Sequence, residues 1–131
     1  MSTATLEAEA LAAADAIIEG FGNHRRGAYF AGFSPDATFV FHSHPKRLES
    51  RAEYEELWRS WERDSAFRVH SCRSTNRRVQ VVGEVAIFTH DVETVLEIDG
   101  VVETAAERET IVLQRSGDGW LCVHEHLSTA S

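Results

Sequence analysis

The spacing of apolar and polar residues changes character halfway along the chain. Up to about residue 66, apolar residues mostly recur every three or four positions, which is typical of helices, and from Phe67 onward they alternate with polar residues as in strands. The pattern predicts helices over Leu6 to Phe21 and Arg25 to Gly32 and a third beginning after Ser50, and strands over Ala37 to Ser43, Phe67 to Val82, Val85 to Ile98, Val101 to Arg115 and Trp120 to Ser128.

Turn and cap signals support these elements. Gly83-Glu84 and Asp99-Gly100 are two-residue hairpin signals, and a tight turn is expected between Ser116 and Gly119. Ser50 and Glu53 have the spacing of a capping box at the start of the third helix. Helices first and a strand meander afterwards predict an α+β fold, in which a curved antiparallel sheet packs on about three N-terminal helices.

Composition narrows the class of protein. The 131 residues are expected to form one domain, residues 1–131. A net charge of −8 argues against nucleic-acid binding, which requires a basic surface. No apolar run suggests a membrane span, and the acidic N-terminal segment does not resemble a signal peptide. Two cysteines without metal-type spacing favour a reducing compartment, so a cytoplasmic location is expected.

The hairpin turns also predict which residues face one another across the sheet. Phe88 is expected opposite Ile111 within an apolar patch that faces the core. Beside this patch, a row of polar side chains is expected to cross four strands on the same face. Its members are Arg77, His90, Glu109 and His126, with His124 one step away.

A carboxylate beside imidazoles can be read in several ways. Glu109 can orient His90 or His126 as a general base, or the same groups can form a satisfied buried polar network. Two histidines and one carboxylate can also make a facial metal site. Arg77 in the same row disfavours a cation and favours an anionic or carbonyl-bearing ligand, so no metal is expected.

The chain resembles the nuclear transport factor 2-like superfamily, especially its SnoaL-like members. The resemblance is carried by the segment SPDATFVF, the capped helix and the ending GDGWLCVHEHLS. This resemblance covers nearly the whole chain. It implies a cone-shaped fold whose concave sheet and helices enclose a pocket, often in a homodimer formed through the sheet. The superfamily contains enzymes and non-catalytic binding domains, so the fold alone does not assign a function.

Ketosteroid isomerase, one member, suggests site positions. The position of its catalytic base is occupied here by Phe41, and that of its oxyanion-hole acid falls near Ile111, which argues against steroid isomerase activity. The resemblance places His124, His126 and Ser128 of the last strand inside the pocket, with Glu109 beside them.

We therefore expect a small-molecule-binding domain, without a cofactor, that can act as an isomerase, cyclase or dehydratase. His90, Glu109 and His126 are the candidate catalytic residues. The candidate ligand-binding residues are Arg77, Phe88, Ile111, His124, Ser128, Phe41 and Trp58. The alternative is a non-catalytic ligand-binding or dimerisation module, and whether the protein is an enzyme stays open. The apolar outer-face residues Val85, Ile87 and Val112 support the homodimer that the resemblance implies.

Overall fold

A computed structural model describes residues 2–130, so the end residues 1 and 131 of the expected domain lie outside the described part. Three helices accompany five strands, as the sequence pattern predicted. In chain order, the elements are α1 (Thr3–Gly22), α2 (Arg26–Phe30), β1 (Phe33–Phe41), α3 (Arg51–Ser65), β2 (Arg68–Val82), β3 (Val85–Ile98), β4 (Val101–Ser116) and β5 (Gly119–Thr129).

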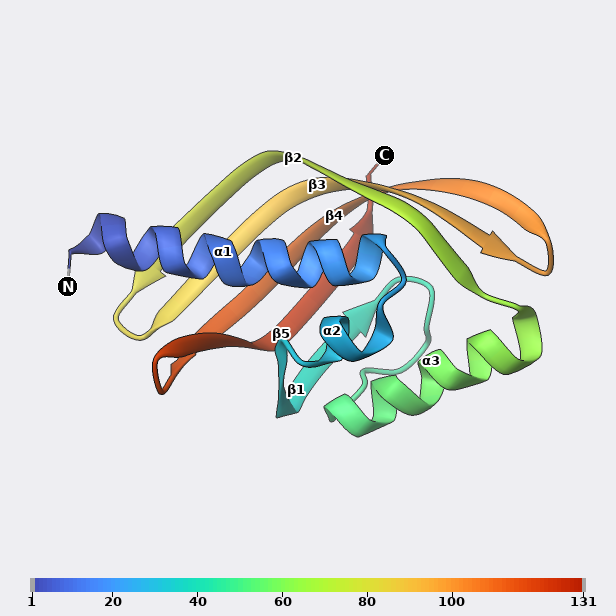
Figure 1. The fold of residues 1–131 in the computed structure, drawn as a ribbon, viewed down its shortest axis with the longest axis horizontal. Helices are drawn as coiled ribbons and strands as arrows, with labels where there is room; N and C mark the ends of the chain where they lie inside the picture. The colour runs from blue at the N-terminus through green and yellow to red at the C-terminus, as the bar shows by residue number, and fades with distance from the viewer. Residues whose placement is uncertain (1, 131) are drawn as a thin grey trace.

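The strands form one curved sheet in the order β1-β5-β4-β3-β2, and the long strands β2, β3 and β4 arch over the helices (Figure 1). The expected α+β fold is confirmed. The four later strands pair antiparallel, as predicted, whereas β1 joins parallel to β5 and makes the sheet mixed. β1 also begins at Phe33, four residues before the predicted start, and its register against β5 shifts between Phe33 and Thr38.

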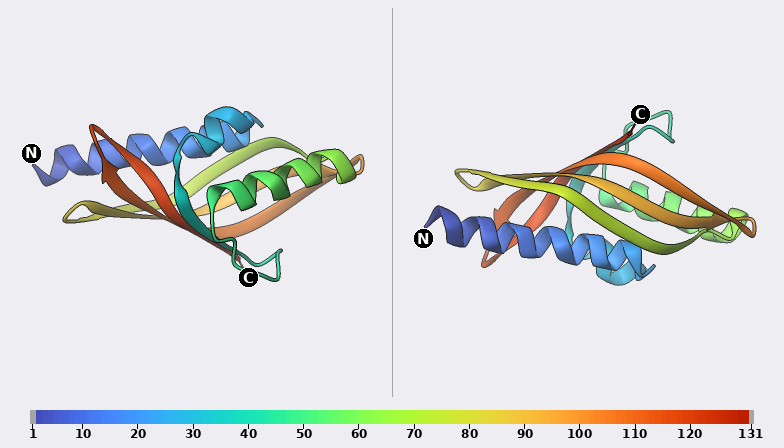
Figure 2. Two further views of the ribbon diagram at one scale, coloured as in Figure 1. Left: turned by 90° about the horizontal axis from the view of Figure 1, so that it is seen from below. Right: turned by 90° about the horizontal axis from the view of Figure 1, so that it is seen from above.

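Capping hydrogen bonds and packing against the sheet fix the positions of the helices. The Ser50 side chain accepts a hydrogen bond from the Glu53 backbone N–H, and the Glu53 carboxylate accepts one from the Glu49 backbone N–H, which caps α3. α1 and α3 both pack against the concave face of the sheet, as the two further views show (Figure 2). Among residues 2–130, no helix has the length and apolarity needed to cross a membrane.

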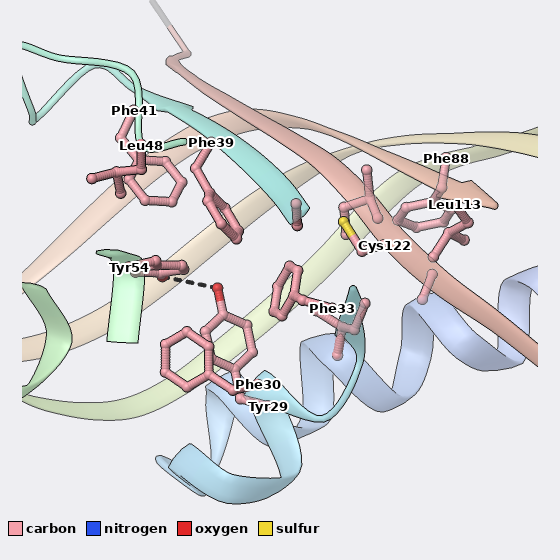
Figure 3. Packing of buried hydrophobic residues seen from close by; sticks show 14 of the residues in the cluster. Tyr29, Phe30, Phe33, Phe39, Phe41, Leu48, Tyr54, Phe88, Leu113 and Cys122 are labelled. Atoms are coloured by element: carbon pink, nitrogen blue, oxygen red, sulfur yellow. Dashed lines mark hydrogen bonds between the residues drawn. The ribbon is translucent and has the colours of Figure 1, made fainter. Parts of the chain in front are cut away.

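Aromatic side chains dominate the core between α2, α3 and β1. Tyr29 and Phe30 of α2 meet Phe33 and Phe39 of β1 and Tyr54 of α3, with most ring planes steeply tilted to one another (Figure 3). Farther along the sheet, the core continues with residues of β3, β4 and β5, namely Ala86, Phe88, Ile111, Leu113, Trp120 and Cys122. A cavity lies over the other end of the sheet, where the later part of β3 and the earlier part of β4 face α3.

Candidate functional site

A cavity of about 380 Å³ lies between the helices and the concave face of the sheet. This volume is within the range of pockets that bind small molecules. α1 contributes Ile17 and Phe21, and α3 contributes Tyr54 and Trp61. The opposite wall comes from the inner faces of β3, β4 and β5. The lining is largely apolar, and its polar groups are concentrated on β4 and β5.

A pair of carboxyl groups is the main polar feature of this wall. Glu109 of β4 and Glu125 of β5 line the cavity and hydrogen-bond to each other through their side chains. They lie diagonally across the strand pair, because Glu109 pairs with Leu127 and Glu125 with Ile111. Glu125 is only 2% exposed. Two acids held this close in an apolar cavity can share one proton.

Two tyrosines extend the network from the helices. The Tyr29 hydroxyl donates a hydrogen bond to Glu125 Oε1 at 3.4 Å and lies 2.9 Å from the Tyr54 hydroxyl (Figure 3). Burial raises the pKa of both phenols well above their ordinary value, and the charge of Glu125 raises these pKa values further. Both tyrosines therefore stay protonated and can donate hydrogen bonds.

Burial also controls the protonation of the carboxyl pair. Loss of hydration raises the pKa of Glu109, and the neighbouring Glu107 charge raises it further. Burial likewise raises the pKa of Glu125 well above its ordinary value, and the Glu109 charge adds to this effect. A raised pKa keeps at least one proton on the pair at neutral pH, so the pair can donate a proton as well as accept one.

His90 supports Glu109 from β3. His90 Nε2 lies 2.6 Å from Glu109 Oε1, and His90 Nδ1 lies 2.6 Å from Ser74 Oγ. Burial and the Arg77 charge lower the pKa of His90 to about 4, so the imidazole is neutral at physiological pH. When Glu109 is protonated it donates to Nε2, and Nδ1–H then donates to Ser74. The expected pairing of His90 with Glu109 is confirmed.

The last strand departs from the predicted register. Leu113 pairs with Cys122 as expected, but Val112 pairs with His124, which leaves Val123 as an extra residue in a β-bulge. One inserted residue exchanges the two faces of a strand for every position that follows. The prediction that His124, His126 and Ser128 face the cavity is therefore wrong, and Glu125 and Leu127 face it instead.

The residues turned outward have other surroundings. His124 Nδ1 lies 2.8 Å from Thr38 Oγ1 of β1, and burial together with the nearby His126 lowers the pKa of His124. His126 and Ser128 are exposed and line a second, more polar groove of about 450 Å³ beside Arg108. His90 and Glu109 also line this groove, whereas Glu125 lines only the cavity.

Most of the other predicted ligand-binding residues also lie elsewhere. Arg77 sits in a bulge of β2 opposite His90 and forms an ion pair with Asp15 of α1, which takes its charge away from the cavity. Three more of these residues are fully buried in the core and do not line the cavity, namely Phe88, Ile111 and Trp58. Phe41 does line it, as predicted.

At the rim of the cavity, a hydrogen bond joins the end of β1 to β4. His42, which follows β1, hydrogen-bonds through Nε2 to the Glu107 carboxylate of β4, and both residues line the cavity. The glutamate is largely buried at 11% side-chain exposure, whereas the histidine is 34% exposed. This contact therefore ties the end of β1 to the mouth of the cavity.

The structure does not assemble the metal site that the sequence allowed. A facial site needs two histidines and a carboxylate on one face, and the bulge in β5 places His126 on the face opposite Glu109 and His90. Within residues 2–130, no group of three or more histidine, cysteine, aspartate or glutamate side chains is arranged to hold a metal ion.

Glu125 is a candidate site residue that sequence reasoning missed. A signal for it existed in the spacing of apolar residues. Trp120 and Leu127 are both apolar but are seven positions apart, so a regular strand cannot direct both inward. A bulge between them resolves this conflict and carries Glu125 to the inner face.

Comparison with known proteins gives a family and a fold. The family model described as a SnoaL-like domain matches residues 10–131. A search of functionally curated proteins found no match. Among solved structures, a ketosteroid isomerase-like protein from Erwinia carotovora atroseptica SCRI1043 superposes with a TM-score of 0.78 at 23% identity, covering 95% of this chain and 96% of that one.

Two further solved structures have the same fold. A nuclear transport factor 2-like superfamily protein from Salmonella enterica serovar Typhimurium LT2 has a TM-score of 0.83 at 16% identity, with 99% of this chain and 94% of that one covered. A proposed dehydratase of the NTF2-like family from Streptomyces avermitilis has a TM-score of 0.76 at 18% identity, with 99% of each chain covered. At these identities the likeness concerns the fold, and activity has to be argued from the cavity.

Proposed function

Because the chain belongs to the SnoaL-like domain family, we propose that its cavity binds a small, largely apolar molecule and that the Glu109–Glu125 pair transfers protons to and from it. The observation that carries the proposal is this pair of hydrogen-bonded carboxyl groups in the cavity wall. Carboxyl groups with raised pKa values are typical of proton-transfer sites, because a general acid works best near the ambient pH.

The pair supports a simple reaction scheme on a carbonyl compound that carries a β-hydroxyl group. The ionised carboxylate of the pair takes the proton from the carbon next to the carbonyl. The partner acid gives its proton to the leaving hydroxyl, so that water departs and a carbon–carbon double bond forms. On a β,γ-unsaturated carbonyl compound, the same carboxylate takes a proton from the α carbon and the partner acid gives its proton to the γ carbon, so that the double bond moves into conjugation with the carbonyl. His90 holds Glu109 in place through the 2.6 Å contact.

The similarity to a proposed dehydratase agrees with this scheme but does not carry it. The competing function is a ligand-binding module without catalysis. The two differ in whether a bound carbonyl compound exchanges protons. In the catalytic case, exchange requires the carboxyl pair, whereas in the binding case the ligand stabilises the protein and remains unchanged.

A ketone probe separates the two functions. We expect 4-phenylbutan-2-one in D₂O to exchange the hydrogens beside its carbonyl faster with the protein than without it, as measured by NMR. The β-hydroxy analogue should lose water to an enone, followed by ultraviolet absorbance. Glu109→Gln and Glu125→Gln should each slow both reactions by about 10²-fold or more. Probe binding without exchange would instead establish the binding module.

Glu93→Gln is the matched control for these variants. Glu93 is exposed on β3 and lies 3.9 Å from Arg73, outside the cavity lining. Its replacement removes one carboxylate from the same sheet and should leave exchange unchanged. If Glu93→Gln slowed the reaction as much as Glu109→Gln did, the assignment to the pair would be withdrawn.

We further propose that the protein forms a homodimer through the convex face of the sheet. Ile87 pairs with Val112 on this face, and Val85 lies beside them, so an apolar strip crosses β3 and β4. Light scattering at micromolar concentration should give twice the mass of the chain. Ile87→Glu should shift the protein to monomer, and a monomeric wild type would contradict the proposal.

We also propose a cytoplasmic location. Both cysteines are free, and burial raises the pKa of Cys72 to about 12, which keeps this thiol protonated and unreactive. Free thiols are typical of a reducing compartment. Fractionation of cells that express the untagged protein should recover it with cytosolic markers.

A further inference from the structure

The two walls of the cavity differ in their chemistry. Because alternate residues of a strand share a face, Glu103, Glu107 and Glu109 project from β4 toward the same cavity, where Glu125 of β5 joins them. The wall contributed by the helices and their flanking segments is aromatic instead. Its rings are those of Phe21, Tyr29, Phe41, Tyr54, Trp61 and Phe67.

Positive charge is scarce on the lining. Among the described residues that line the cavity, none is a lysine or an arginine. Within residues 2–130, His42 is the one basic side chain that lines the cavity, and it is hydrogen-bonded to Glu107. Arg77, which the sequence suggested as an anchor for an anion, pairs with Asp15 outside the cavity. A carboxylate or phosphate ligand would therefore meet acidic groups and no strong counter-charge.

Aromatic rings and carboxylates together suit the opposite kind of ligand. The electron-rich face of an aromatic ring attracts an ammonium group, most strongly for tryptophan, and a carboxylate adds a charged hydrogen-bond acceptor. Trp61 packs against Phe67 and Tyr54 with ring centroids 5.3 and 6.3 Å apart, so these rings form a continuous surface. This surface lines the same cavity as Glu103 and Glu107.

We propose that the cavity selects a ligand that carries a protonated amine on an apolar body. The amine binds to the Glu107 and Glu103 carboxylates of β4 and to the aromatic surface of Trp61, while the Glu109–Glu125 pair faces the reacting part of the molecule. This inference rests on the proposed function, because it assumes that the cavity is the ligand site. It adds the charge of the ligand and the residues that bind the charged group.

Three probes with one carbon skeleton test the charge preference. They are 3-phenylpropylamine, 3-phenylpropan-1-ol and 3-phenylpropanoate, which are cationic, neutral and anionic at pH 7. We expect the amine to raise the melting temperature and to bind at least tenfold tighter than the alcohol by calorimetry, with the anion weakest. Equal binding of amine and alcohol, or preference for the anion, would overturn the proposal.

Two variants test whether Glu107 causes the preference for the amine. Glu107→Gln should reduce amine binding about tenfold and leave alcohol binding within twofold, because it removes charge and keeps the shape. Glu93→Gln, outside the cavity, should change neither. An unaltered amine preference in Glu107→Gln would refute the assignment, and circular dichroism of the variant checks that it is folded.

The outcomes also separate this proposal from the proposed function. Glu109→Gln should abolish proton exchange on the ketone probe while 3-phenylpropylamine still binds better than the alcohol. If the amine preference fails while exchange persists, only the ligand class is wrong. If exchange fails while the amine preference persists, the cavity is an amine-binding site without catalysis.

Discussion

His90 Nε2 lies 2.6 Å from Glu109 Oε1, yet the two side chains form a neutral hydrogen bond rather than an ion pair. Burial lowers the pKa of the imidazole to about 4 and raises the pKa of the carboxyl group, so at neutral pH each group favours its uncharged form. This arrangement avoids the cost of burying two charges. It also leaves a proton on Glu109, where the proposed chemistry needs one.

Removing the His90 imidazole should destabilise the protein, whereas removing that of His126 should not. His90→Ala removes the partner of the Ser74 hydroxyl and one of the hydrogen-bond partners of the Glu109 carboxyl group, so we expect a loss of about 2–4 kcal/mol in urea unfolding. His126→Ala changes an exposed side chain and should stay within about 0.5 kcal/mol. Equal losses would mean that β5 lacks the bulge at Val123.

The raised pKa of Glu109 predicts a pH-dependent stability. The folded state raises this pKa from 4.5 to about 8, so the folded protein retains a proton that the unfolded chain releases. The resulting stability is fully present below pH 4.5 and is lost as the pH rises toward 8. Glu109→Gln mimics the protonated acid and should therefore be more stable than wild type at pH 8, by on the order of 1–3 kcal/mol, and about equal at pH 4.

Thermal unfolding at pH 4, 6 and 8 measures this difference. Glu93→Gln serves as the control, because Glu93 is exposed and its replacement should leave the pH profile parallel to that of the wild type. A Glu109→Gln variant that is less stable than wild type at pH 8 would show that Glu109 is ionised in the folded protein.

The contrast between β4 and β5 shows how far sequence reasoning reached. The turn at Asp99-Gly100 has two residues with positive φ, as a tight hairpin requires, so counting from it placed His90 opposite Glu109 correctly. The turn before β5 was also located correctly, and Leu113 meets Cys122 as counted. The count then failed at Val123, because this bulge contains no glycine or proline to mark it.

The same limit explains the outcome for the candidate site. His90 and Glu109 were found because a regular hairpin connects them, whereas Glu125 was assigned to the wrong face after a single inserted residue. The hydrophobic periodicity also does not show whether an inward-facing side chain is buried in the core or lines the cavity. Trp58 and Trp61 share one helix stripe, but Trp58 is fully buried in the core and Trp61 lines the cavity. Only the packing of α3 against the sheet separates them.

The close approach of α1 and α2 predicts a strong effect at Gly20. A Cβ atom at this position would lie 2.9 Å from the Tyr29 backbone nitrogen, so Gly20→Ala must move α2 and with it the Tyr29 hydroxyl. We expect a loss of about 1–3 kcal/mol in urea unfolding. Gly27→Ala is the matched control, because nothing lies within 4 Å of its Cβ and alanine favours helix α2. It should be neutral or stabilising, and similar losses in both variants would contradict the close contact.

The end of α3 offers a position where a smaller residue should stabilise the fold. Ala66 follows the helix with φ of +50°, in the left-handed region, where the Cβ atom is strained by the adjacent carbonyl oxygen. Ala66→Gly relieves this strain and should raise the free energy of unfolding by about 1 kcal/mol.

Ala12→Gly is the control and should instead lower the free energy of unfolding, because Ala12 is exposed within α1 and glycine there costs about 0.5–1 kcal/mol of helix stability. Urea unfolding of the two variants under one set of conditions compares them directly, and a destabilising Ala66→Gly would mean that the α3 terminus does not hold residue 66 in the left-handed conformation.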